Sequence, residues 1–184
     1  MSGMPQASGS ILTVCTGNIC RSPVVEVLLR AAAGDAFQIS SAGTRAVVGA
    51  GISAPMAALL ADGGFSPLFF SARQIFPDHV RAADLVLTAT VAHRATVVEM
   101  APAAVRRTFT VLEFARIMAL LGERLGEEPL ADLVPRVAAA RFAVAAGQDD
   151  LPDPYGQSDA VYLQSYKHIR AAVTTMTGRE APVP

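Results

Sequence analysis

An α/β protein built around a parallel sheet is the fold class that the sequence predicts, on three observations. Short apolar segments typical of buried strands alternate with segments whose apolar residues recur at helical spacing. The strand-like segments are almost continuously apolar, as in a parallel sheet covered by helices on both faces. The 184 residues, 52% of them hydrophobic, are enough to bury one core. We therefore expect a single domain over residues 1–184.

The N-terminal part of the chain predicts two strands with a helix between them. Residues 11–14 and 37–41 are the strand-like segments. The helix is expected to begin at Ser22, because serine is a good N-cap, and Pro23 is favoured in the first turn. Gly34 is expected to end it.

The remaining elements continue the alternation. A helix is predicted over residues 54–61, a strand over 84–88, a helix over 91–100 and a strand over 108–111. A final helix is expected to follow Ser158, which can cap it.

Residues 112–146 interrupt this alternation. Two runs of apolar residues at helical spacing are separated there by Gly122, Gly126 and Pro129. Pro135 weakens the start of the second helix. We interpret this segment as a helical insertion within the domain.

Composition excludes several classes of protein. A formal net charge of −1 argues against a strongly basic nucleic-acid binder. Two cysteines and three scattered histidines make a disulfide scaffold or a metal site improbable. The longest apolar stretch, residues 46–61, is broken by glycine and proline and is too short to insert into a membrane. These features predict a cytoplasmic protein with reduced thiols.

The most informative motif lies between the first predicted strand and the helix after it. Its sequence is Cys15-Thr16-Gly17-Asn18-Ile19-Cys20-Arg21-Ser22. Backbone N–H groups converge on anions at strand-to-helix turns of this kind. Five residues separate Cys15 from Arg21, so the loop can curl around one tetrahedral phosphate while the arginine binds two of its oxygens. A nucleotide-binding P-loop is disfavoured because the Gly-Lys-Ser/Thr ending is missing.

Cys15 is the predicted nucleophile of this loop. A helix N-terminus and a neighbouring arginine favour the reactive thiolate over the thiol. The side chains of Asn18, Ser22 and Ser41 are candidates to hold the loop in shape. The competing interpretation, an inert buried cysteine, is disfavoured because the full Cys-x5-Arg-Ser string stands at the predicted turn.

A second group must protonate the leaving oxygen in such a reaction. Asp153, in a loop stiffened by Pro152 and Pro154, is the candidate, and Tyr155 can offer an aromatic wall to a substrate ring. Alone, an aspartate before proline is more often a turn residue. Together with the cysteine loop, the pattern favours a general acid.

These motifs resemble a known family. Residues 15–23 resemble the phosphate-binding loop of the low-molecular-weight protein tyrosine phosphatases, and residues 153–155 resemble their general-acid loop. Residues 40–44, 72–74 and 84–87 look like further landmarks of the family. The resemblance covers about residues 11–109, and then residue 151 to the final helix.

The resemblance implies a flavodoxin-like arrangement of four parallel strands with helices on both faces, no cofactor, and no metal. It implies two-step hydrolysis of a phosphotyrosine protein through a phosphocysteine on Cys15. Arg21 and the loop amides from Thr16 to Ser22 would bind the phosphoryl oxygens, and Asp153 would be the general acid. Cys20 matches a second cysteine that forms a reversible disulfide with Cys15 during oxidation; simple loop packing is its equal alternative.

The chain departs from the family pattern at two positions. Phe70 replaces a histidine before the Ala-Arg-Gln landmark, and Gly156 stands where tyrosine-specific members have a second aromatic residue. Val47 and Val48 are therefore candidates, with Ile19 and Tyr155, for the substrate pocket, although both valines suit an ordinary core equally well.

Three other functions stay open on the same motifs. A protein-arginine phosphatase has a similar loop but carries threonine at the position of Ile19, and Gly156 fits its acid loop. An arsenate reductase shares the Cys-x5-Arg loop but needs redox cysteines downstream, and none follows Cys20. A phosphoprotein-binding module without turnover is the non-enzymatic alternative. The histidines at 79, 93 and 168 are expected at the surface or in helix caps.

Overall fold

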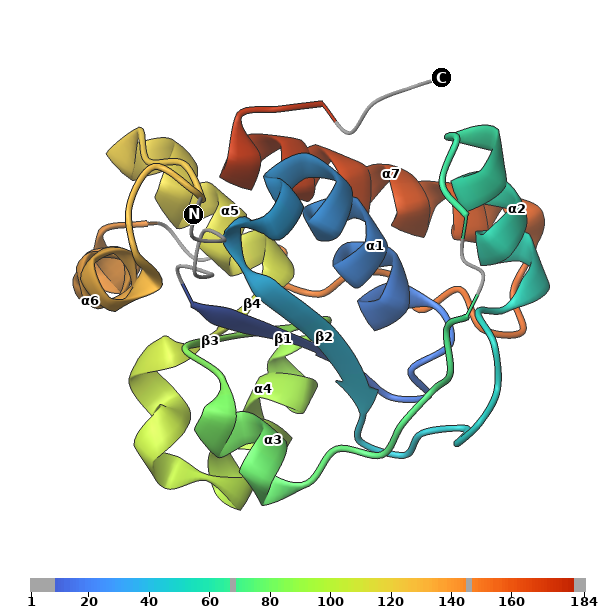
Figure 1. Ribbon diagram of the computed structural model, residues 1–184, viewed down its shortest axis with the longest axis horizontal. Helices are drawn as coiled ribbons and strands as arrows, with labels where there is room; N and C mark the ends of the chain where they lie inside the picture. The colour runs from blue at the N-terminus through green and yellow to red at the C-terminus, as the bar shows by residue number, and fades with distance from the viewer. Residues whose placement is uncertain (1–8, 67–68, 145–146, 181–184) are drawn as a thin grey trace, which may run out of the picture.

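The computed structural model describes residues 9–66, 69–144 and 147–180, and in them four parallel strands form one sheet in the order β2-β1-β3-β4 (Figure 1). The strands are β1 (Ser10–Cys15), β2 (Gln38–Gly43), β3 (Leu85–Thr88) and β4 (Thr108–Thr110). The predicted α/β class and the four-stranded parallel sheet are confirmed.

Helices cover both faces of this sheet. They are α1 (Arg21–Ala33), α2 (Ala54–Asp62), α3 (Pro77–Ala82), α4 (Val91–Met100), α5 (Val111–Leu121), α6 (Leu130–Ala140) and α7 (Asp159–Thr177), with short 3₁₀ helices η1 (Gly34–Ala36), η2 (Pro102–Arg107) and η3 (Arg141–Ala143). Helices α1, α5 and α7 lie on one face, and α3 and α4 lie on the other (Figure 1). None of the helices described has the length and apolar character needed to cross a membrane.

The central strand β1 shows why the sheet needs both helical layers. Side chains alternate between the faces of a strand. Ile11 packs into the cluster under α1 and α7, whereas Leu12 and Val14 pack into the cluster under α3 and α4. All three are almost fully buried. The continuous apolar run of β1 therefore follows from its position between two cores.

Strand order creates a crevice at the carboxyl end of β1. Because β1 pairs with β2 on one side and β3 on the other, the connections that leave β1 and β3 diverge. Helix α1 follows β1 onto one face and α4 follows β3 onto the opposite face. Ligands of open α/β sheets bind at such a point.

The structure corrects the predicted start of the first helix. Helix α1 begins at Arg21, one residue before the predicted cap, and Ser22 lies inside its first turn. The Ser22 hydroxyl contacts Cys15 and Asn18 instead of capping the helix. The Ser22 side chain, which the local sequence predicted as the helix cap, therefore makes tertiary contacts in the loop instead.

The segment predicted as a helical insertion, residues 112–146, contains most of α5 and the whole of α6 and η3. Helix α5 begins at Val111 and packs against α7 on the sheet, with Phe114 and Ile117 fully buried. It is one of the helices that make the core. Helix α6, with Pro135 inside it, and η3 form the outlying part of the segment, and residues 145 and 146 lie outside the described residues.

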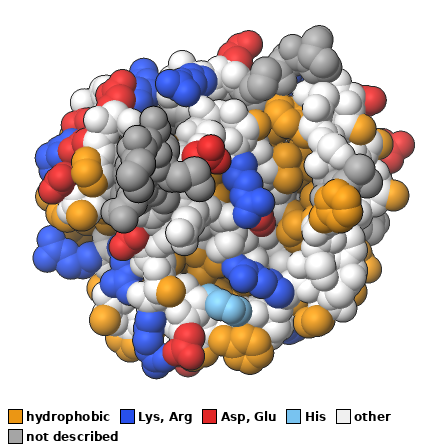
Figure 2. Space-filling model, in the orientation of Figure 1, with side chains coloured by type: hydrophobic (Ala, Val, Ile, Leu, Met, Phe, Trp, Pro, Cys, Tyr) orange, Lys and Arg blue, Asp and Glu red, His pale blue; other side chains and the backbone are white. Residues whose placement is uncertain are grey.

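Arginine side chains cover both edges of the sheet. At β2, Arg30 Nε donates to Ile39 O at 3.1 Å and Arg73 Nε donates to Ser41 O at 2.7 Å. Lys and Arg side chains accordingly lie across the middle of the face in Figure 2, in front of this strand. At β4, Arg141 Nη2 donates to Thr108 O at 2.7 Å. Charged groups on an edge strand prevent pairing with another chain.

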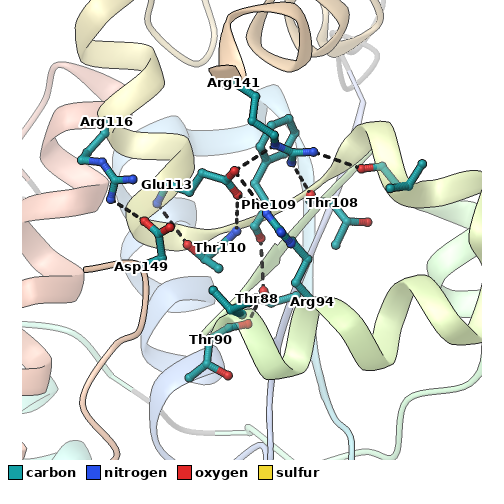
Figure 3. Close-up of polar contacts among 12 residues, drawn as sticks. Thr88, Thr90, Arg94, Thr108, Phe109, Thr110, Glu113, Arg116, Arg141 and Asp149 are labelled. Atoms are coloured by element: carbon teal, nitrogen blue, oxygen red, sulfur yellow. Dashed lines mark hydrogen bonds and ion pairs between the residues drawn. The ribbon is translucent and has the colours of Figure 1, made fainter. Parts of the chain in front are cut away.

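Arg141 also belongs to a charged cluster that fastens η3 to the sheet (Figure 3). Glu113 is the centre of the cluster and is mostly buried. Its carboxylate lies 3.0 Å from Arg94 Nη1 and 2.8 Å from Arg141 Nε. It also accepts the N–H of Thr110 at 3.2 Å, which completes a capping box at the start of α5. The Arg141 guanidinium stacks 4.2 Å from the Phe109 ring centre.

Removal of this carboxylate should destabilise the fold. Glu113→Ala leaves two partly buried arginines without their anion and removes half of the capping box, so we expect a loss of about 3 kcal/mol in the free energy of unfolding by urea denaturation. Asp78→Ala is the matched control, because Asp78 pairs with Arg81 in full view of solvent, and it should leave that free energy unchanged. Equal effects of the two variants would contradict this account.

Candidate active site

The loop of residues 15–22 lies at the carboxyl end of β1, where the strand order predicts a ligand site. A cavity of about 200 Å³ opens over it. The cavity is lined by Cys15, Thr16, Gly17, Ile19, Cys20, Arg21, Arg45, Val47, Asp153 and Tyr155. The loop, the segment after β2 and the loop before α7 thus come together at one point.

Asn18 gives the loop its shape. Its φ of 54° is left-handed, a conformation that asparagine tolerates better than most residues. The side chain is fully buried, and Oδ1 accepts the N–H of Arg73 at 2.9 Å, which identifies Nδ2 as the end facing the loop. Nδ2 donates to Ser22 Oγ at 3.0 Å and to Ser41 Oγ at 2.8 Å. Both polar atoms of the Asn18 side chain are therefore hydrogen-bonded to groups inside the protein.

These bonds form a directed chain that ends on Cys15. Ser41 Oγ lies 2.5 Å from Glu26 Oε2 and donates to that carboxylate. Ser22 Oγ accepts from Asn18 and lies 3.0 Å from Cys15 Sγ, to which it can donate when the sulfur is a thiolate; its other acceptor, Ala42 O, is 3.5 Å away. A donor aimed at sulfur stabilises the thiolate form of cysteine. The predicted supporting role of Asn18, Ser22 and Ser41 is consistent with this arrangement.

The segment after β2 holds the loop from outside. Thr44 N donates to Cys15 O and Arg45 N donates to Thr16 O, both at 2.9 Å, and Val47 N donates to Gly17 O at 3.0 Å. Such a close approach requires glycine at position 43. A Cβ built there would lie 2.4 Å from Thr16 O.

Arg21 is buried at the first position of α1 and reaches into the cavity. Its Nη2 lies 2.7 Å from Asp153 Oδ2. Its Nε is buried and has no hydrogen-bond partner among the described residues. A buried donor without an acceptor is costly, and an anion in the cavity would satisfy it.

The Asp153 loop is fastened to the same end of the sheet. Leu151 N donates to Ala89 O, just after β3, at 2.9 Å. Asp153 Oδ1 accepts the N–H of Tyr155 at 3.2 Å, which makes a local turn. Gly156 follows with a φ of 73°, a left-handed conformation that favours glycine over residues with a Cβ.

Cys20 has a different environment from Cys15. It is buried, and its Sγ lies 3.2 Å from Ser53 Oγ. Burial is the main cause that raises the pKa of the Cys20 thiol above its usual value. Both cysteines are free thiols in this structure.

The structure brings most of the predicted pocket residues together. Ile19, Val47 and Tyr155 line the cavity with Cys15, but Val48 does not. Val48 is exposed, so it belongs neither to the cavity nor to the core. Phe70 also lies away from the cavity lining.

Three residues at the site were given no role there by the sequence analysis. Arg45 lines the mouth of the cavity, and Glu26 ends the polar chain described above. His93 was expected at the surface or in a helix cap. It does lie in the cap of α4, where its N–H donates to Thr90 Oγ1, but its side chain is buried and its Nε2 lies 2.8 Å from Thr16 Oγ1. A glutamate among the apolar residues of α1 was the one available indication, since a buried carboxylate needs partners.

A parallel α/β sheet with a cysteine and an arginine in an anion-binding loop defines a phosphate-binding protein of the cysteine-dependent class. A family model described as low molecular weight phosphotyrosine protein phosphatase matches residues 10–121. The chain belongs to this family. The predicted family and the hydrolase class that goes with it are confirmed, and α5 lies within the match.

Two relatives of known name are similar over much of the chain. A protein-arginine-phosphatase of Geobacillus stearothermophilus is 36% identical over 104 residues, which are 56% of this chain and 70% of that protein. The probable low molecular weight protein-tyrosine-phosphatase AmsI of Erwinia amylovora is 33% identical over 123 residues, 67% of this chain and 78% of that protein.

Solved structures of both kinds share the fold. The crystal structure of the Erwinia amylovora tyrosine phosphatase AmsI has a TM-score of 0.70, with 27% identity over 91% of this chain and 90% of that one. The YwlE arginine phosphatase from Geobacillus stearothermophilus has a TM-score of 0.68, with 26% identity over 91% and 89%.

Asn18→Ala should damage both stability and activity. It removes three buried hydrogen bonds and places alanine at a left-handed φ, so we expect about 3 kcal/mol less unfolding free energy and about a hundredfold less phosphatase activity. Asn18→Gly tolerates the backbone conformation but lacks the hydrogen bonds. It should lose as much activity and less stability, as measured by urea denaturation. Full activity in the glycine variant would show that the loop does not depend on this side chain.

Proposed function

We propose that this protein hydrolyses phosphotyrosine in proteins through a phosphocysteine on Cys15, without a metal. The observation that carries the proposal is that Cys15, the Asp153 carboxylate and an Arg21 Nε with no acceptor among the described residues share one cavity. Family membership supports the same chemistry.

The first step is attack of the Cys15 thiolate on phosphorus. An S–P bond forms and the P–O bond to the tyrosine oxygen breaks, while Asp153 gives its proton to that oxygen. Arg21 and the loop N–H groups hold the three equatorial oxygens as negative charge shifts onto them. The Ser22 hydroxyl, 3.0 Å from Cys15 Sγ, favours sulfur as a leaving group later.

The second step returns the enzyme to its starting state. The Asp153 carboxylate takes a proton from water as that water attacks phosphorus. The S–P bond breaks, inorganic phosphate leaves and Cys15 is again a thiolate. The exposed position of the Asp153 side chain gives water access to it.

Phosphotyrosine fits the walls of the cavity. Ile19 and Val47 offer apolar surface and Tyr155, which is largely exposed, offers an aromatic ring beside Asp153. Arg45 adds a cation at the mouth, which suits an acidic residue near the phosphotyrosine. An acidic phosphoprotein substrate accords with these features, and we place it in the cytoplasm on the sequence-based expectation alone.

Asp153→Asn is the test of the proposed acid. Turnover of a phosphotyrosine peptide in the presence of a chelator should fall by about two to three orders of magnitude. The loss should shrink for aryl phosphates with acidic phenols, since these leave without a proton. Cys15→Ser, the control, should release no phosphate from any of them. Equal losses across the series would remove Asp153 from this role, and turnover by Cys15→Ser would remove the nucleophile.

Phosphoarginine is the second candidate substrate. It is favoured by the similarity to a protein-arginine-phosphatase and by Gly156, which leaves the acid loop without a second aromatic residue. Ile19 argues for phosphotyrosine, because relatives of the arginine type carry threonine there.

Ile19→Thr decides between these substrates. Replacement of an apolar wall by a hydroxyl should raise turnover of phosphoarginine relative to phosphotyrosine by about tenfold. Ile19→Val, which keeps an apolar wall, should leave the ratio unchanged. Wild-type protein that already prefers phosphoarginine would overturn the tyrosine assignment.

A further inference from the structure

His93 joins the loop to a helix on the other side of the crevice. It stands in the first turn of α4, where Thr90 is the N-cap and accepts the His93 N–H at 3.2 Å. The ring nitrogens each face a threonine hydroxyl. Nδ1 lies 2.7 Å from Thr90 Oγ1, and Nε2 lies 2.8 Å from Thr16 Oγ1. The Thr16 residue follows Cys15 and lines the cavity.

The ring of His93 is neutral in these surroundings. Burial, followed by the charge of Arg21, lowers the pKa of His93 to about 4. The charged groups that face it are Arg21 from α1, Arg45 from the segment after β2, and Asp150 and Asp153 from the loop before α7. The first turn of a helix also disfavours a cation.

A neutral imidazole has one donor and one acceptor, so the two hydrogen bonds must run in one direction. If Nδ1 carried the proton, Thr90 Oγ1 would accept twice, from that proton and from the His93 N–H. Its own proton would then have no acceptor among the described residues. If Nε2 carries the proton, Thr90 donates to Nδ1 and accepts the N–H, and every group is used.

We propose that His93 is a positioning residue that donates its Nε2 proton to Thr16 Oγ1 and thereby keeps the Thr16 proton for an oxygen of the bound phosphoryl group. This rests on the proposed function for its catalytic consequence, but the hydrogen-bond direction does not. Thr16 Oγ1 has no other partner among the described residues. Because the His93 ring donates to Thr16 Oγ1, the Thr16 hydroxyl proton is free to be donated to a group in the cavity that Thr16 lines.

The direction of these bonds is measurable by nitrogen-15 spectroscopy of labelled histidine. The chain has three histidines, and His93→Gln assigns the signal. From pH 6 to 8 we expect the Nε2-protonated tautomer of His93. A Nδ1-protonated ring, or a charged one, overturns the proposal. This result does not depend on whether the protein is a phosphatase.

Binding of inorganic vanadate, an analogue of the phosphoryl group, tests the role of Thr16 without turnover. Thr16→Val and His93→Asn should each weaken vanadate binding about tenfold, and the double variant should be no weaker than either alone. Thr16→Ser keeps the hydroxyl and is the control. His93→Gln can place an amide N–H where Nε2 stands, so it should recover most of the affinity.

Kinetics then connect the pair to the reaction. In phosphotyrosine hydrolysis the same variants should lower kcat about tenfold, with His93→Gln and Thr16→Ser close to wild type. If His93 has a purely structural role, His93→Asn and His93→Gln should lower kcat equally, and their effects should add to that of Thr16→Val. That result overturns the proposal. Wild-type protein that binds vanadate as expected but releases no phosphate would contradict the proposed function and leave this inference intact.

Discussion

The side-chain amide of Asn18 is the contact on which the site depends. It has no exposure to solvent, and it fixes a left-handed turn at the centre of the loop. Because Arg73 N occupies its oxygen, its nitrogen must donate to Ser22 and Ser41, and Glu26 accepts from the far end. These contacts place the Ser22 hydroxyl 3.0 Å from Cys15 Sγ, within hydrogen-bond distance of the sulfur. A buried network of this kind stabilises one loop conformation only when each member is satisfied.

The sheet supplies the rigid support for this network. The loop of residues 15–22 begins at the carboxyl end of β1 and the segment with Arg45 and Val47 follows β2, and these two strands are held in register by their neighbours. Gly43 lets the segment after β2 approach the loop backbone, and Leu151 ties the acid loop to the end of β3. Sites held by regular elements keep their geometry better than sites on free loops. Arginines at both edges meanwhile keep the sheet from pairing with other chains.

The buried titratable groups of the site differ in their electrostatic surroundings. Cys15 Sγ lies beside the Ser22 hydroxyl, whereas Cys20 Sγ lies beside Ser53 and burial raises the pKa of the Cys20 thiol. His93 is neutral because burial and a neighbouring arginine disfavour its charged form. The two cysteines are only five residues apart in sequence, so their difference comes from the groups packed around them and not from the motif itself. One loop can thus hold two cysteines in different surroundings.

The sequence by itself determined the parallel α/β class, the family and the Cys-x5-Arg loop, because apolar periodicity and residue spacing are local properties of the chain. It could not determine the start of α1, since the Ser22 hydroxyl accepts a hydrogen bond from a side chain that the folded loop places beside it. It missed His93 and Glu26 for the same reason, because each acts through a partner far along the chain or on another element. It predicted Val48 as a pocket residue, but the Val48 side chain is exposed to solvent and does not line the cavity. Only tertiary structure decides which polar groups meet, because hydrogen bonds are paired in space and local sequence specifies only the elements that carry them.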